Sequence, residues 1–224
     1  MERYGSLIQI KPDHEERYII LHNNTFPGVL EQIRNSNISN YSIFLRDFPE
    51  GKMLFSFFEY TGEDFQADMD GMAADPLTRD WWKLTIPMQI PLESRKEGEW
   101  WATIGELFHM DGDRKSPGDV RRYAGAVEIV PGSVSEYRSL YETIHSDVLE
   151  RFRKSNMSNF SIYLHETRIY SYFEYSGDDF AKDMDSMMDD PETAAFLNAV
   201  RALQKKLPGE NEWWLEMREV FHTD

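Results

Sequence analysis

The chain contains two copies of one sequence unit. Ser36–Leu45 recurs as Ser155–Leu164, with seven of ten positions identical. Phe55–Pro76 recurs as Tyr170–Pro191, with 13 of 22 positions identical. A long internal repeat constrains the fold strongly, because both copies must form the same kind of structure. Two copies are too few for a solenoid, so the repeat indicates two small domains that pair with each other.

A polar stretch between the copies marks the domain boundary. Gly112–Asp119 is rich in glycine, proline and charge, which is typical of linkers. We therefore predict a first repeat over residues 1–112 and a second over residues 121–224. The two repeats are expected to pair with each other, and further association into a homo-oligomer stays open.

The composition excludes several classes of partner and site. Among 224 residues there are 40 acidic and 24 basic side chains, a formal charge of −16, which disfavours binding to nucleic acid or an anionic membrane. The absence of cysteine excludes disulfides, thiolate zinc sites and cysteine nucleophiles. No apolar run reaches the roughly 18 residues of a membrane helix, and Met1–Ser6 does not begin a secretory signal. We expect a soluble, cytoplasmic protein.

The order of predicted elements is the same in both copies. In the first copy, four strand-like runs and helical segments after Pro12 and Pro76 follow one another as β-α-β-β-α-β. The strand-like runs are Leu7–Ile10, Tyr41–Leu45, Met53–Tyr60 and Ile104–Met110. This order predicts an α+β chain of two ferredoxin-like repeats.

Several motifs in register relate the first copy to a known family. They are Ile8–Asp13, Glu16–Tyr18, His22-Asn23, Phe26-Pro27, Asn40–Phe44, Trp81–Lys83 and Glu106–Phe108. In order and spacing they resemble the L-rhamnose mutarotase family, and the second copy resembles it more weakly. Members are usually single-repeat chains that dimerise as α/β barrels. The resemblance therefore implies that the two repeats here pack as an intramolecular dimeric α/β barrel.

The resemblance also implies a function. The family interconverts the α and β anomers of a deoxy-hexose, so we expect an isomerase acting on L-rhamnose or a related 6-deoxy sugar. Opening the pyranose removes a proton from O1 and delivers one to the ring oxygen, and a histidine suits such transfers. The partner is then a small sugar, and no cofactor or metal is expected.

Five residues of the first copy are candidates for the site. The resemblance places His22 at the family's proposed catalytic acid, and Tyr18 lies four residues earlier, on the same face of a predicted helix. Tyr18 and Tyr41 are candidates for binding sugar hydroxyls. Of the adjacent pair Trp81 and Trp82, one is expected to offer a flat apolar face to the sugar, with a slight preference for Trp82. The alternative for His22 is an ordinary helix histidine hydrogen-bonded to a neighbour, and for the tyrosines and tryptophans it is ordinary core packing.

The second copy departs from the first at these positions. Tyr141 stands at the position of His22, Phe196-Leu197 replaces the two tryptophans, and Tyr137 retains the first tyrosine. A histidine, His145, lies one helical turn further on. Two interpretations follow. Either the second site is inactive and the repeat is a structural partner, or His145 transfers protons in a differently shaped site with Tyr137 and Tyr141.

Two other functions compete with a mutarotase. The chain could be a non-catalytic sugar-binding or structural module on the same fold. It could also be a different enzyme, such as a monooxygenase or dehydratase, because one fold hosts many activities. The sequence offers no flavin or haem motif in favour of that third option.

Overall fold

The computed structural model describes residues 1–113, 115–207 and 209–224 and divides into two compact units. Unit 1 consists of Met1–Ile104 with Arg218–Asp224, and unit 2 consists of Gly105–Met217. The predicted linker, residues 112–119, includes Arg114, which lies outside the described residues.

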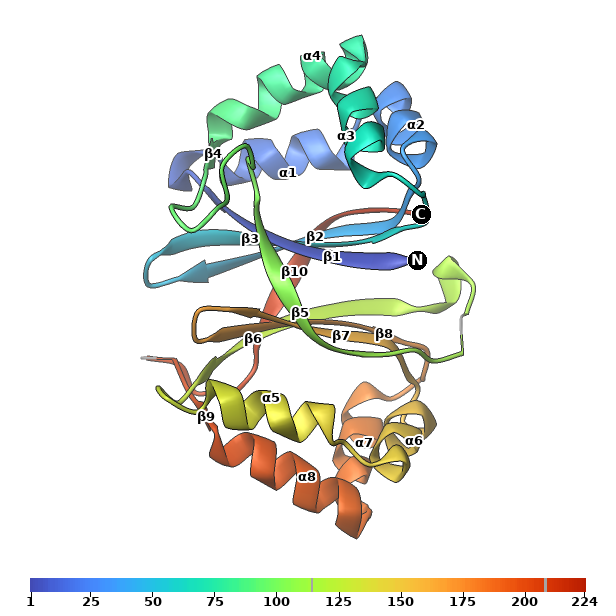
Figure 1. Ribbon diagram of the computed structural model, residues 1–224, viewed down its shortest axis with the longest axis vertical. Coiled ribbons are helices and arrows are strands. Elements are labelled where there is room, and N and C mark those ends of the chain that lie inside the picture. The colour runs from blue at the N-terminus through green and yellow to red at the C-terminus, as the bar shows by residue number, and fades with distance from the viewer. Residues whose placement is uncertain (114, 208) are drawn as a thin grey trace. The chain divides into compact units, whose positions relative to one another are not determined.

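Unit 1 is an antiparallel sheet with helices on one face (Figure 1). Its elements are β1 (Glu2–Ile10), a 3-10 turn (Pro12–His14), α1 (Glu15–Asn23), α2 (Pro27–Asn35), β2 (Ile38–Phe48), β3 (Gly51–Tyr60), α3 (Phe65–Ala74), α4 (Pro76–Thr85), a 3-10 turn (Ile86–Met88), β4 (Gln89–Ile90), the start of β5 (Ala102–Met110) and the end of β10 (Leu215–Thr223). The strand order is β5-β1-β3-β2-β10, and β4 also pairs with β1.

Unit 2 repeats this plan. Its elements are the rest of β5, a 3-10 turn (Pro117–Asp119), β6 (Arg121–Ile129), α5 (Val134–Glu142), α6 (Ser146–Lys154), β7 (Met157–His165), β8 (Arg168–Tyr175), α7 (Phe180–Asp185), a 3-10 turn (Ser186–Asp189), α8 (Pro191–Ala202), β9 (Gln204–Lys205) and the start of β10. The strand order is β5-β7-β8-β6-β10, and β9 pairs with β6. Both units have the β-α-β-β-α-β order, so the predicted α+β class and the ferredoxin-like repeats are confirmed.

The last strand of each repeat is divided between the units. In unit 1, β5 pairs with β1 only through Ala102–Ile104, and in unit 2 it pairs with β7 from Gly105 onward. Strand β10 begins in unit 2, where Leu215–Met217 pairs with β6, and ends in unit 1, where it pairs with β2. Unit 1 is therefore completed by Arg218–Asp224, from the end of the second repeat.

Local signals in the sequence mark where helices α2 and α4 of unit 1 begin. The carboxylate of Asp75 accepts a hydrogen bond of 2.6 Å from the backbone N–H of Thr78, and Pro76 occupies the first helical position of α4. Pro27 likewise occupies the first position of α2, which has no side-chain cap, after α1 has ended at Asn23.

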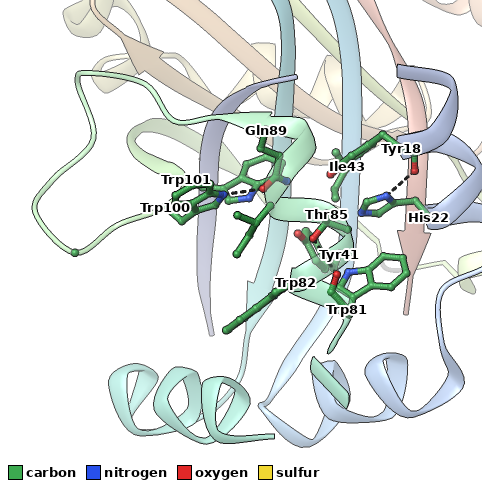
Figure 2. Close-up of a pocket in the computed structure, with 12 residues that line it drawn as sticks. Tyr18, His22, Tyr41, Ile43, Trp81, Trp82, Thr85, Gln89, Trp100 and Trp101 are labelled. Carbon is green, nitrogen blue, oxygen red and sulfur yellow. Dashed lines mark hydrogen bonds between the residues drawn. The ribbon is translucent and has the colours of Figure 1, made fainter. Parts of the chain in front are cut away.

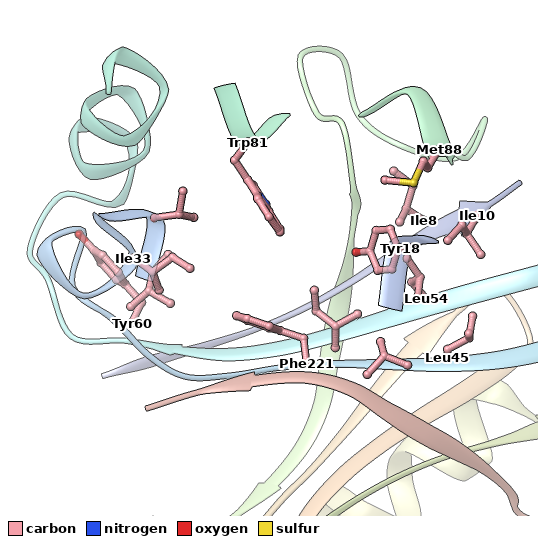
Figure 3. Packing of buried hydrophobic residues seen from close by; sticks show 14 residues of the cluster. Ile8, Ile10, Tyr18, Ile33, Leu45, Leu54, Tyr60, Trp81, Met88 and Phe221 are labelled. Carbon is pink, nitrogen blue, oxygen red and sulfur yellow. The ribbon is translucent and has the colours of Figure 1, made fainter. Parts of the chain in front are cut away.

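The core of unit 1 lies between the helices and the sheet. Figure 3 shows Tyr18 and Trp81 pointing from their helices toward the strands, where Leu54 is fully buried. Phe221 reaches the same cluster from β10. The core is thus built from both ends of the chain.

No helix in the described part of the chain has the length and apolar character needed to cross a lipid bilayer.

Candidate functional site

Two hollows that share seven lining residues lie under the helices of unit 1, with volumes of about 370 and 360 Å³. We call them together the first-repeat cavity. The shared residues are His22, Tyr41, Ile43, Trp81, Trp82, Trp100 and Trp101. They come from α1, β2, α4 and the segment between β4 and β5 (Figure 2). The volume suits a small organic ligand.

His22 is held in one tautomer. It lies in the last turn of α1 with 9% of its surface exposed, and its Nδ1 is 2.8 Å from the carbonyl oxygen of Tyr18. A carbonyl oxygen can only accept, so Nδ1 carries the proton and the lone pair of the neutral ring is on Nε2. Burial lowers the pKa of His22 to about 4, although the bond to the Tyr18 carbonyl opposes the shift. The imidazole is therefore neutral at pH 7.

Three aromatic rings from three elements surround this imidazole. The Tyr18 ring is stacked on it at 3.9 Å between centroids, and Trp81 of α4 lies edge-on at 5.2 Å. Phe221 of β10 lies edge-on at 5.5 Å. These rings exclude water from around His22 and so cause the low pKa. The contribution of Phe221 was missed by the sequence analysis, because it depends on how β10 is divided between the units.

Tyr18 brings a buried hydroxyl to the cavity. Its side chain is fully buried, and its hydroxyl oxygen makes no hydrogen bond within the described residues. Burial raises the pKa of Tyr18 well above 10, and the nearby side chain of Gln89 only partly offsets this rise. A buried hydroxyl without a partner costs about 1–3 kcal/mol, which a ligand oxygen would recover. Tyr18 is therefore suited to bind a polar ligand.

Tyr41 lies on β2 at the cavity wall and is partly buried. Its ring meets those of Phe58 and Phe221 edge-on at 5.6 and 5.4 Å. Burial raises its pKa, so the phenol stays protonated at neutral pH.

Both tryptophans of the adjacent pair line the first-repeat cavity. Trp81 is 6% exposed and packs edge-on against Phe26 at 5.4 Å, whereas Trp82 is partly exposed. The sequence analysis expected only one of the two to face inward. Instead, the cavity contacts the side chains of both Trp81 and Trp82.

A second pair of tryptophans was not assigned to the site from the sequence. Trp100 and Trp101 also line the cavity, and the Trp100 Nε1–H donates to Gln89 Oε1 at 2.7 Å. Glu99 beside them accepts from the backbone N–H groups of Lys96 and Thr103 at 3.0 and 3.3 Å. Partial burial raises the pKa of Glu99, but these bonds outweigh it and leave the pKa below its usual value. The available signal was the Glu-Trp-Trp motif, which recurs at residues 212–214.

Unit 2 has a cavity of about 670 Å³ in the equivalent place, which we call the second-repeat cavity. Tyr141 lines it at the position of His22. Tyr137 is fully buried, and its hydroxyl accepts a hydrogen bond of 3.3 Å from Gln204 Nε2.

His145 lies elsewhere in unit 2. Its side chain is 60% exposed, and its Nδ1 is 3.0 Å from a carboxylate oxygen of Glu192. It caps α6 and does not line the second-repeat cavity. With Asp147 and Glu192 it forms a group whose ligand atoms lie within 4.8 Å of one another, a spacing that could hold a metal ion. All three residues are exposed, and such charged groups are common at helix ends without an ion.

Comparison with known proteins gives a consistent result. A family model described as L-rhamnose mutarotase matches residues 3–110 and 122–223. An L-rhamnose mutarotase of Oceanobacillus iheyensis is 28% identical over 112 residues, 50% of this chain and 100% of that protein. One from Mannheimia succiniciproducens is 32% identical over 82 residues, 37% of this chain and 74% of that protein.

The fold also has solved counterparts. A candidate monooxygenase from Lactobacillus acidophilus NCFM aligns with a TM-score of 0.59 and 8% identity, over 100% of this chain and 96% of that one. This likeness concerns the fold alone.

Proposed function

Because the chain belongs to the L-rhamnose mutarotase family, we propose that it interconverts the α and β anomers of L-rhamnose or a related 6-deoxy sugar in the first-repeat cavity. The proposal rests on the state of His22. Its imidazole is buried and neutral, and its ring lines an aromatic cavity. Its Nδ1 is occupied by the hydrogen bond to the Tyr18 carbonyl. Nε2 is then the nitrogen that meets the sugar.

The proposed reaction is a proton transfer between two oxygens on the same carbon. Nε2 of His22 accepts the proton of the O1 hydroxyl while C1=O1 forms and the C1–O5 bond breaks. The imidazolium then returns its proton to O5, which gives the open-chain aldehyde. Rotation about C1–C2 and the reverse steps close the ring on the other face. No oxidation state changes, so the chemistry calls for acid–base groups only.

The low pKa of His22 suits the second half of this transfer. An imidazolium with a pKa of about 4 is a stronger acid than a solvated one, so it gives up its proton to O5 readily. The same low pKa keeps the ring neutral, and therefore able to accept the first proton, over the whole physiological range.

The remaining residues of the cavity would hold the sugar. The indoles of Trp81 and Trp82 offer flat apolar surfaces to the C–H groups of a pyranose. The unpartnered hydroxyl of Tyr18 and the phenol of Tyr41 would bond sugar oxygens. Binding would thus satisfy a hydroxyl that the protein itself leaves without a partner.

We assign catalysis to the first repeat and a supporting role to the second. Tyr141 stands where the imidazole is needed, and burial raises its pKa well above 10, so it cannot accept a proton from a sugar near neutrality. The support given to the first repeat includes Arg218–Asp224, which completes unit 1.

Saturation transfer between the anomeric protons of L-rhamnose tests the proposal. With the protein present, exchange should exceed the rate in buffer alone at pH 7. Exchange no faster than in buffer for L-rhamnose and for L-fucose would exclude it.

A further inference from the structure

The second-repeat cavity lies outside the site that we propose for anomer exchange. At about 670 Å³ it is within the range of small-molecule sites. Aromatic and methionine side chains make up most of its lining, so apolar surface faces the cavity. Covering such surface with a ligand would be favourable, because it removes apolar surface from water.

Part of the first-repeat cavity is preserved here. Gln204 pairs with Ile129 of β6, as Gln89 pairs with Ile10 of β1, and both glutamines line their cavities. Trp214 lines the second cavity at the position that Trp101 has in the first. An amide and an indole suited to a sugar are therefore present in both.

The imidazole and two hydroxyl groups of the first-repeat cavity are lost here. Tyr141 replaces His22, and Phe160 replaces Tyr41. Val200 stands at the position of Thr85, which removes another hydroxyl. Among the described residues that line this cavity there is no histidine. A sugar bound here would not meet the imidazole that is proposed to exchange the anomers in the first repeat.

The second-repeat cavity is larger than either hollow of the first repeat and has a mostly apolar lining. Leu197 replaces the indole of Trp82, and four methionines line the cavity. They are Met157, Met184, Met187 and Met188, of which Met184 and Met187 correspond to Met69 and Met72 of the first-repeat cavity. Methionine side chains adapt to irregular apolar ligands. The exposed charged residues at the cavity, Asp185, Arg201 and Glu216, are of both signs, which favours an uncharged ligand.

We propose that the second-repeat cavity binds a 6-deoxyhexose that carries an aryl or alkyl group on its anomeric oxygen. The inference rests on the proposed function, because it takes the sugar class from the first repeat. The anomeric carbon of such a glycoside is locked as an acetal and has no O1 proton to remove. A site without an imidazole therefore suits it, and the apolar part of the cavity takes the substituent. Hydrolysis of a glycoside of this class is the reaction that would supply free sugar to His22.

Methyl NMR of the full chain labelled at methionine tests the proposal. Met157, Met184 and Met187 report on the second-repeat cavity, while Met69 and Met72 report on the first. The probes are 4-nitrophenyl α-L-rhamnopyranoside, L-rhamnose and 4-nitrophenol. The glycoside should shift the second-repeat methyls and bind there about tenfold more tightly than either component alone, a difference of about 1.4 kcal/mol.

Two variants locate the binding. Leu197→Trp restores the indole of the first repeat, narrows the cavity and should weaken glycoside binding about tenfold. Its thermal unfolding shows whether it folds, and Leu197→Phe is the milder substitute if it does not. His22→Ala should leave the glycoside-induced shifts of the second-repeat methyls in place.

Each outcome decides one claim. If the glycoside shifts no second-repeat methyl, or if L-rhamnose or 4-nitrophenol alone binds there as tightly, this inference is overturned. Absence of anomer exchange in the same L-rhamnose samples would instead overturn the proposed function. The two failures are therefore separable.

Discussion

The Nδ1–H of His22 donates to the carbonyl oxygen of Tyr18 at 2.8 Å, one helical turn back along α1. This bond joins the two residues that the sequence places on one helix face, and it determines which ring nitrogen is available for chemistry. A helix carbonyl normally accepts from the backbone N–H four residues on. Here it also accepts from the side chain at that position, so the tautomer of His22 is set by the helix itself.

The first prediction concerns the imidazole. His22→Ala should lower the enzymatic rate of anomer exchange by about 100- to 10,000-fold, because it removes the proposed acid–base group. His145→Ala is the matched control, since His145 is exposed and caps α6 away from either cavity. Saturation-transfer NMR on L-rhamnose measures both variants. Equal rates in the two would show that the reaction does not depend on His22.

The second prediction is a pH dependence of the rate. The pKa of His22 is about 4, below the ordinary value of 6.5, because of burial. Enzymatic exchange, after subtraction of the buffer rate, should stay constant as pH falls through 6.5 and decline only near pH 4. A midpoint close to 6.5 in the pH–rate profile would show that the imidazole is solvated in the working enzyme.

The third prediction concerns how the lowered pKa of His22 affects the stability of the folded chain at different pH values. Between pH 6.5 and 4 the unfolded chain binds a proton at His22 that the folded chain does not. The stabilisation of the folded chain that follows from this pKa difference is fully present above pH 6.5 and is lost as pH falls toward 4. The loss in the free energy of unfolding is up to about 3 kcal/mol. Urea unfolding at several pH values should show a smaller loss for His22→Ala than for the unmodified chain. Parallel losses would contradict the assignment.

The fourth prediction compares two equivalent tyrosines. Tyr18→Phe removes a buried hydroxyl without a partner, so it should raise the free energy of unfolding by about 1–3 kcal/mol. Tyr137→Phe removes the acceptor of the Gln204 bond and should cost about 1 kcal/mol. Anomer exchange should fall only for Tyr18→Phe. Denaturant unfolding and NMR exchange of both variants check this. If Tyr18→Phe lowered stability and left anomer exchange unchanged, Tyr18 would be assigned to the core alone.

The fifth prediction tests the residue that the last strand contributes. Phe221→Leu should lower anomer exchange, because Phe221 packs against the rings of both His22 and Tyr41. Phe108→Leu is the equivalent change in unit 2, where Phe108 packs against Tyr141 and Phe160. Each should cost about 1 kcal/mol of stability. A similar effect of the two on exchange would mean that Phe221 acts only through stability.

Much of the site was predictable because it depends on short-range spacing. Tyr18 and His22 share a face whenever that segment is helical, and Asp75-Pro76 determines where the helix carrying Trp81 and Trp82 begins. Trp100 and Gln89 were not predicted. Gln89 lies on the two-residue strand β4, and Trp100 lies in the irregular segment between β4 and β5, so no periodicity describes their path to the cavity.

The amino-acid sequence by itself determined the repeat, the α+β plan of each copy and the loss of the imidazole at Tyr141, since these follow from identities and local patterns. Only the tertiary structure decided that β10 brings Phe221 to His22 and that burial makes this imidazole neutral. Strand pairing across more than 170 residues and the exclusion of water both depend on groups far apart along the chain. Their effects arise only when the chain has folded.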